Sequence, residues 1–246
     1  MTLAPTSVHP GREQHRSRWV LVAILAFLLG GVAVALLHHF DAFGGSSNST
    51  TSTTDGSGVP ATQARDVAAF TSVELAGSNN VVIRAGEKPS VVVRADDNLL
   101  DRVTTEVQSG KLVIANTPGT LTTKSPMSVA VNVPTLSALT LTGSGNIVVN
   151  GIETESLKVT LPGSGTLTAS GTATRLDIAV SGSGMVQFTQ LVANDVRAVV
   201  SGSGSIFVTA TNSLDASVSG SGAILFAGNP QDVTKSVTGT GAIAGS

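Results

Sequence analysis

Hydrophobic residues follow two different patterns along the 246-residue chain. Near the N-terminus they form one unbroken run, Trp19 to Leu37, of 19 residues without a charged or strongly polar side chain. From Phe70 onward they alternate with polar residues in short stretches. The first pattern is typical of a membrane-spanning helix, and the second is typical of half-buried β-strands.

The unbroken run predicts one transmembrane helix over residues 19–40. As a helix the run would extend about 28 Å at about 1.5 Å per residue, which matches the ~30 Å core of a bilayer. Three arginines and a single glutamate precede it. This positive bias predicts that residues 1–18 are a short cytoplasmic tail and that the bulk of the chain is extracytoplasmic.

A cleaved signal peptide is the alternative interpretation of the same run. Ala33-Val34-Ala35 has the small-x-small pattern of a cleavage site. However, Leu36 and Leu37 extend the apolar run past that site, and the total length favours retention. Both interpretations place most of the protein outside the cytoplasm, and we expect a single-pass protein of the cell membrane.

Residues 41–66 are rich in glycine, serine and threonine and contain almost nothing to bury. This composition predicts a flexible linker. Asn48-Ser49-Thr50 fits a glycosylation acceptor, although an unmodified tether is the simpler interpretation.

A glycine-rich tripeptide recurs through the remaining residues, 67–246. Gly-Ser-Gly begins at Gly143, Gly163, Gly182, Gly202 and Gly220, and Gly-Thr-Gly begins at Gly239. In almost every copy, apolar residues stand two and four positions before the first glycine and four and six positions after it. Each copy of 18–20 residues therefore predicts a strand, a glycine corner, a second strand and a polar loop.

The copies are of nearly equal length, contain short strands and show no helical period, which predicts an all-β domain. The expected fold is a single-stranded parallel β-helix, in which equivalent residues of successive copies stack in columns. An earlier copy stands at Gly77, with Asn79 in place of the second glycine. Alternating runs between Ser90 and Val133 extend the count to roughly nine turns, although insertions blur the register there. At the corner, positive φ or close packing excludes a β-carbon.

A column of charges supports this register independently. Five residues before the first glycine stand Ala138, Lys158, Asp177, Arg197, Asp215 and Thr234. Stacked on successive turns, the four charged residues alternate in sign, and a slipped register would bring like charges together. The middle residues of the tripeptides, five serines and Thr240, would form a hydroxyl ladder along one edge.

The tandem Gly-Ser-Gly strands, the opening Phe70-Thr71-Ser72-Val73-Glu74-Leu75 and the closing Gly228-Asn229-Pro230 resemble the putative autotransporter adhesin head domain, called the GIN domain. The resemblance covers residues 67–246. It implies a β-helix fold and a bacterial cell-envelope surface domain, without an established activity. The non-glycine corner at Asn79 and the Gly-Thr-Gly at Gly239 depart from the pattern, which bears on the capping turns.

The composition excludes several kinds of chemistry. The chain has no cysteine or tyrosine, and its only tryptophan and all four histidines precede the linker, so the repeat region offers no imidazole or thiol for catalysis. The glycines are adjacent to each serine and a strand follows, which does not fit a nucleophile elbow. A net charge of −2 argues against nucleic acid as a partner. We therefore expect no catalytic residue, cofactor or metal site.

A β-helical polysaccharide lyase is the most serious enzyme alternative, since that architecture can present carboxylates and a basic residue. The candidates are Asp96, Asp97 and Asp101 near Arg94 and Arg102, or Asp177 and Asp215 beside Arg197. The first set falls in a polar insertion, and the alternating charge column explains the second. We therefore do not expect an enzyme.

An outward column of the repeat predicts a surface-binding site. Five residues after the first glycine stand Val148, Thr168, Gln187, Phe207, Leu225 and Ala244. Val148, Phe207 and Leu225 are candidate contact residues, because apolar side chains on a flat outer face can bind a partner.

These patterns predict a membrane-anchored extracytoplasmic β-helix domain that acts as a non-enzymatic surface-binding or adhesin-like module. Its expected partners are the lipid bilayer, through residues 19–40, and an envelope glycan, an envelope protein or another copy of the chain. The alternative is an envelope stress or signalling component in which the domain senses and residues 1–18 relay.

If the apolar run is a retained anchor, full-length protein purified from cell membranes will keep its original N-terminal region. Mass spectrometry of the intact protein checks this. A mature N-terminus at Leu36 would contradict the anchor and favour the signal peptide.

Overall fold

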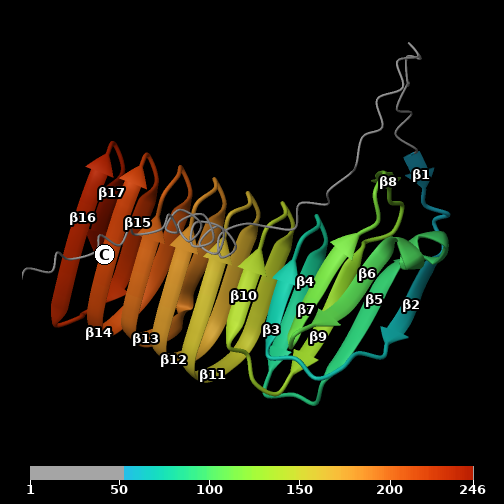
Figure 1. Cartoon of the computed structure of the whole chain (residues 1–246), viewed down its shortest axis with the longest axis horizontal. Coiled ribbons are helices and arrows are strands. Elements are labelled where there is room, and N and C mark those ends of the chain that lie inside the picture. Colours follow the sequence, from blue (N-terminus) through green and yellow to red (C-terminus); the bar gives the residue numbers. More distant parts are fainter. Residues whose placement is uncertain (1–52, 246) are drawn as a thin grey trace, which may run out of the picture. The chain divides into compact units, whose positions relative to one another are not determined.

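Parallel strands stack into one long β-solenoid in the computed structural model, which describes residues 53–245 (Figure 1). The predicted cytoplasmic tail, the predicted transmembrane helix at 19–40 and residues 41–52 lie outside this range. Among the described residues, no helix has the length and apolarity needed to cross a membrane.

The elements of the N-terminal half are short. They are β1 (Thr53–Asp55), β2 (Pro60–Arg65), β3 (Ser72–Leu75), β4 (Asn80–Ala85), β5 (Ser90–Asp96), the 3-10 helix η1 (Asp97–Arg102), β6 (Val103–Gln108), β7 (Lys111–Asn116), β8 (Thr120–Thr122) and β9 (Ser128–Val133). The C-terminal half contains the long strands. They are β10 (Ala138–Leu141), β11 (Asn146–Leu161), β12 (Thr166–Val180), β13 (Met185–Val200), β14 (Ser205–Gly220), β15 (Ala223–Gly228), β16 (Asp232–Gly239) and β17 (Ala242–Gly245).

Each long strand of the C-terminal half runs from one glycine corner to the next and pairs in parallel with the strands above and below it. This confirms the predicted all-β solenoid of stacked repeats. The solenoid makes about five turns, so the expected nine are not confirmed. Part of the difference arises between residues 90 and 133, where the chain reverses direction instead of continuing the coil.

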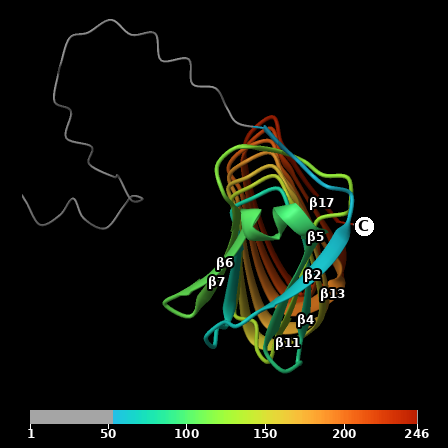
Figure 2. The same cartoon turned by 90° about the vertical axis from the view of Figure 1, so that its right-hand side faces the viewer.

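The N-terminal end departs from chain order. The Gly77 copy stacks against the Gly143 copy, and β7 and β9 form the next layer below β3 and β4. Beyond that layer the pairing becomes antiparallel, with β5 on β9, β6 on β7 and β2 on β5. Figure 2 looks onto this end, where η1 and the antiparallel strands lie in front of the coil. The end of the core is thereby covered, with Leu99 of η1 fully buried.

The predicted linker at 41–66 needs correction at its C-terminal end. Strand β2 pairs with β5 along its whole length, and β1 pairs in parallel with β8. The folded domain therefore includes residues 53–66, ahead of the expected start at residue 67. Strand β2 is held in place by backbone pairing with the edge of β5. It therefore needs few buried hydrophobic side chains, and its sequence shows little hydrophobic pattern.

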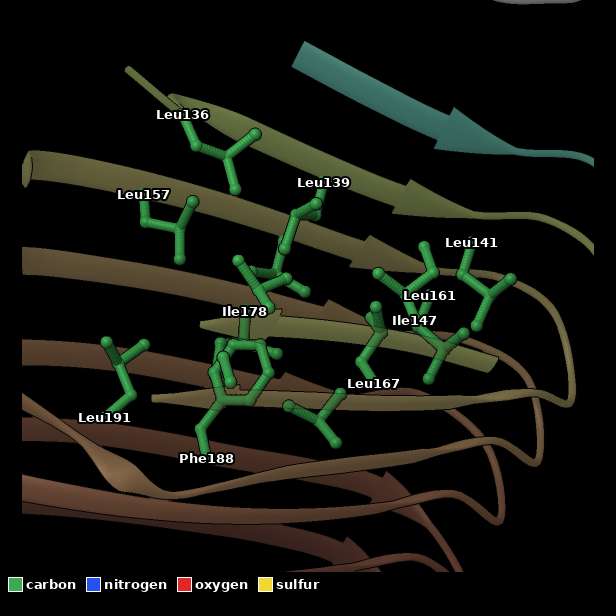
Figure 3. Close-up of a cluster of buried hydrophobic side chains, with 14 of the residues drawn as sticks. Leu136, Leu139, Leu141, Ile147, Leu157, Leu161, Leu167, Ile178, Phe188 and Leu191 are labelled. Atoms are coloured by element: carbon green, nitrogen blue, oxygen red, sulfur yellow. The ribbon is translucent and has the colours of Figure 1, made fainter. Parts of the chain in front are cut away.

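The core is built from the inward columns that the repeat predicts (Figure 3). These columns are buried over successive turns. They include Leu139, Val159, Ile178, Ala198 and Ala216 before the corner, and Ile147, Leu167, Val186, Ile206 and Ile224 after it. Burying an aliphatic side chain of this size stabilises a fold by about 1.5–3 kcal/mol. The stacked aliphatic columns therefore supply the main stabilisation of a domain with few aromatic residues.

The corners require glycine mainly because the backbones of successive turns approach closely. A β-carbon on Gly163 would lie 2.2 Å from the carbonyl oxygen of Gly143, and one on Gly182 would lie 2.1 Å from that of Gly163. Real β-carbons do not approach that closely to any atom outside their own chain neighbours. Close packing therefore explains most corners, although the later corners at Gly220 and Gly239 also have positive φ.

Asn79, the one non-glycine corner residue, lies where this stacking ends. Its side-chain amide donates to Asn116 Oδ1 at 3.0 Å, and Asn116 Nδ2 donates back to Asn79 Oδ1 at 3.4 Å. Asn116 ends β7, and the chain then leaves the coil in a loop instead of a glycine corner. At the other corners, the glycine corner of the neighbouring turn fills this space. At the last corner the buried Asn79 side chain fills it.

The charge column is confirmed in register. Lys158, Asp177, Arg197 and Asp215 are direct partners on successive strands, between Ala138 and Thr234. Arg197 Nε lies 3.9 Å from Asp215 Oδ2, and both side chains are largely exposed. Pairs of this kind contribute about 0–1 kcal/mol, so they select the register more than they add stability. In the predicted hydroxyl ladder, the Thr240 hydroxyl donates to Ser221 Oγ at 3.0 Å.

We expect Gly163→Ala to destabilise the domain by about 3 kcal/mol, because its β-carbon would overlap the turn below. Ser164→Ala is the matched control, since the Ser164 side chain is exposed at the same corner. Chemical denaturation of the two variants measures the difference. Equal unfolding midpoints would contradict the account of the corners.

Candidate functional site

The two sheet faces of the solenoid carry different side chains. The strand segments before each corner form what we call the charged face, with Lys158, Asp177, Arg197 and Asp215 in one column and Arg175 and Asp195 in the next. The segments after each corner form the uncharged face. Its outward residues from β11 to β17 are Asn146, Val148, Asn150, Thr166, Thr168, Ser170, Met185, Gln187, Thr189, Ser205, Phe207, Thr209, Ala223, Leu225, Ala227, Ala242 and Ala244.

The candidate contact residues Val148, Phe207 and Leu225 all lie on the uncharged face. Phe207 and Leu225 are direct neighbours on β14 and β15. Val148 stands in the same column but is separated from Phe207 by Thr168 and Gln187 on two intervening turns. The structure therefore brings two of the three candidates together and places the third apart.

Sequence reasoning missed a second apolar group in the same column. Val148 pairs with Val82, Val82 pairs with Ala130, and Ala130 pairs with Val92. These residues come from strands whose spatial order differs from their order in the chain. Their alternation is visible in the sequence, but the repeat length alone does not align them with Val148.

The regular stacking is interrupted beside Phe207. Between β13 and β14 the pairing passes from Phe188–Val208 directly to Val192–Thr209, so residues 189–191 of β13 have no partners in β14. Leu191 remains buried in the core, while Thr189 and Gln190 are exposed. This bulge borders an open hollow of about 370 Å³, lined by Thr168, Gln187, Thr189, Gln190 and Phe207.

The charged face has a hollow of about 350 Å³, and several of its polar lining groups already interact with one another. Asp195 accepts hydrogen bonds from the Ser213 hydroxyl and the Asn212 amide, both at 2.7 Å. These two bonds, together with the nearby charge of Arg175, hold the pKa of the Asp195 carboxyl below its usual range. Asp195 therefore stays ionised near neutral pH and is poorly suited to donate a proton.

The acidic residues considered for a lyase do not converge on an open site. Asp96 is fully buried, whereas the Asp97 carboxylate accepts a 2.5 Å hydrogen bond from the Ser57 hydroxyl. Arg102 donates to the Pro118 carbonyl oxygen at 2.9 Å. Within the described range, 53–245, no three histidine, cysteine, aspartate or glutamate side chains are grouped so that they could hold a metal ion.

Asp96 has a structural role at the covered end. Its carboxylate accepts backbone hydrogen bonds from Lys124 at 2.9 Å, Gly58 at 3.1 Å and Ser125 at 3.3 Å. The bonds from Lys124 and Ser125 are the main reason that the pKa of Asp96 lies below its ordinary value of 3.8. One carboxylate thus ties the chain before β2 and the loop before β9 to the end of β5.

These features define the class of protein as an all-β solenoid domain with one charged and one uncharged face. The family model described as "Putative auto-transporter adhesin, head GIN domain" matches residues 69–230, and the chain belongs to this family. This confirms the resemblance drawn from the repeats. No curated protein matches the chain.

Solved structures share the fold at low sequence identity. A putative adhesin from Bacteroides fragilis superposes with a TM-score of 0.66 at 23% identity, covering 78% of this chain and all of its own. A putative adhesin from Parabacteroides distasonis gives 0.52 at 22% identity and a putative lipid binding protein from the same species gives 0.51 at 23%, each covering 79% of this chain and all of its own. At this identity the likeness shows the fold.

Acid should weaken the covered end through Asp96. Since its pKa is lower in the folded state than in the unfolded state, its stabilisation is present above about pH 4 and is lost as the pH falls through the folded-state pKa. Asp96→Asn should therefore lower stability at neutral pH and flatten the loss of stability in acid. Unfolding curves between pH 2 and 7 test this.

Asp101→Asn is the matched control, because Asp101 is an exposed acid on η1. It should keep the wild-type pH dependence. The same acid profile in both variants would contradict the role assigned to Asp96.

Proposed function

We propose that this protein is a membrane-anchored, extracytoplasmic surface-binding module that binds its partner on the uncharged face and carries out no catalysis. The observation that carries the proposal is that none of the outward residues that β11 to β15 and β17 contribute to this face is charged. Depletion of charge, with Phe and Met present, is typical of the centre of protein interfaces.

The size of the face supports binding to a macromolecule. Six strands form it, in the spatial order β11, β12, β13, β14, β15 and β17, and the same sheet continues through β4, β9 and β5, where Arg84 and Arg94 point outward. At about 4.8 Å per strand and about 3.3 Å per residue, the uncharged part measures roughly 24 Å by 20 Å, and the nine-strand sheet measures roughly 38 Å by 20 Å. That footprint is close to the ~800 Å² that each partner buries in a standard stable interface.

Adhesion agrees with the description of the family and with two of the structural neighbours, which are named putative adhesins. Anchoring rests on the apolar run at 19–40, and non-enzymatic action rests on the absence of histidine, cysteine and tyrosine from residues 67–246. In this proposal the anchor holds the module at the cell membrane, and the regular face presents the same chemistry over a long distance.

Phe207→Ser should reduce binding at least fivefold, because it removes the largest apolar group of the face. Bacterial cells displaying the full chain can be tested for self-aggregation and for attachment to surfaces coated with envelope glycans or envelope proteins. Val199→Ser is the matched control, since Val199 is a half-buried apolar residue that points outward on the charged face. If Phe207→Ser changes none of these readouts, the uncharged face is not the binding site.

A further inference from the structure

The hollow beside Phe207 is a local departure from the repeat. On one side of β13, Thr168 pairs with Gln187 and then Ser170 pairs with Gln190, so β13 contains one extra residue there. On the other side, residues 189–191 lack partners in β14. Two independent shifts of register in the same few residues place Thr189 and Gln190 at the rim of the hollow.

The bulge is held by a specific contact. The Thr209 hydroxyl of β14 donates to the Thr189 carbonyl oxygen at 3.0 Å, which satisfies a backbone group that the ladder leaves without a strand partner. Leu191 anchors the same segment in the core. The rim of the hollow is therefore fixed by the fold on both sides of Gln190.

The lining combines neutral polar groups with one aromatic ring. Two amides come from Gln187 and Gln190, two hydroxyls come from Thr168 and Thr189, and the ring comes from Phe207. Within residues 53–245, the side chains of Gln190 and Thr168 make no hydrogen bond, and the Gln187 amide has only the weak acceptor Met185 Sδ at 3.0 Å. Most of this hydrogen-bonding capacity is thus available to a ligand.

We propose that this hollow binds one neutral sugar ring of a glycan chain that lies across the uncharged face. The assignment rests on the proposed function, because it names the class of ligand for that face. Sugar hydroxyls donate and accept hydrogen bonds, as do the amide and hydroxyl groups of the lining. The C–H groups of a sugar ring carry slight positive charge and match the negative face of the Phe207 ring.

The lack of charge in the lining selects against other ligands. A phosphate or carboxylate needs a cationic partner to replace its hydration, and no lysine or arginine lines the hollow. The volume of about 370 Å³ lies at the small end of the ~300–1,000 Å³ range of ligand pockets, which fits a single ring. Because the hollow is open, neighbouring rings of a polymer can continue over adjacent turns.

The test uses the full chain in detergent micelles and three neutral hexasaccharides, namely the oligomers of α-1,4-glucose, β-1,4-glucose and β-1,4-N-acetylglucosamine. A hexamer of galacturonic acid serves as the charged comparison. Isothermal titration calorimetry should detect saturable binding of at least one neutral hexamer and none of the charged one. Absence of binding by all three neutral hexamers overturns the proposal.

Variants locate the binding. Gln190→Ala should weaken the Kd about fivefold and Phe207→Ala at least tenfold, whereas Gln108→Ala, which changes an exposed glutamine on β6, should leave it unchanged. Gln190 makes no side-chain hydrogen bond in the described range, so its variant should keep the wild-type unfolding midpoint. Binding that is insensitive to both Gln190 and Phe207 also overturns the proposal.

The outcomes separate this assignment from the proposed function. If no neutral hexamer binds while Phe207→Ser still reduces self-aggregation or attachment to envelope proteins, the face binds protein and the sugar assignment is wrong. If neither glycan binding nor attachment depends on Phe207, both proposals are wrong.

Discussion

The rest of the structure depends on the close approach of one backbone turn to the next at the glycine corners. The carbonyl oxygen of each corner occupies the space that a β-carbon of the next corner would need, as at Gly143 and Gly163. Backbone pairing between parallel strands sets a spacing of about 4.8 Å per turn. Glycine lets the corners keep that spacing, so the register of both faces continues from one turn to the next. The aliphatic columns and the alternating charges are aligned as a result, since each residue lies above its equivalent in the previous copy.

A regular stack makes its irregular residues informative. On the uncharged face, most outward side chains on successive turns are small, or polar and neutral. Phe207 and the bulge at 189–191 do not follow this rule, and they lie next to each other. The stack accommodates three residues that have no partner in β14, because Leu191 still reaches the core and the Thr209 hydroxyl binds the displaced backbone. A binding site can therefore arise in a repeat without loss of the repeat itself.

Prediction from sequence succeeded where structure is periodic and failed where it is not. The inward columns and the pairing of Lys158, Asp177, Arg197 and Asp215 follow from counting, because equal copies can stack in few ways. Counting could not reveal that residues 90–133 turn back on themselves, since antiparallel and parallel strands share the same alternation. Strand β2 was not predicted for a related reason: its position depends on pairing with the edge of β5, which is distant in sequence.

The sequence by itself determined the solenoid, its register and the candidates Phe207 and Leu225, because each depends only on spacing along the chain. Only the tertiary structure decided that Val148 lies beside Val82, and that a hollow opens where β13 bulges. The first depends on which strands become neighbours in the sheet, and the second depends on how many residues each strand has between two bends of the chain. Contacts between segments distant in sequence set those quantities, and no local pattern records them.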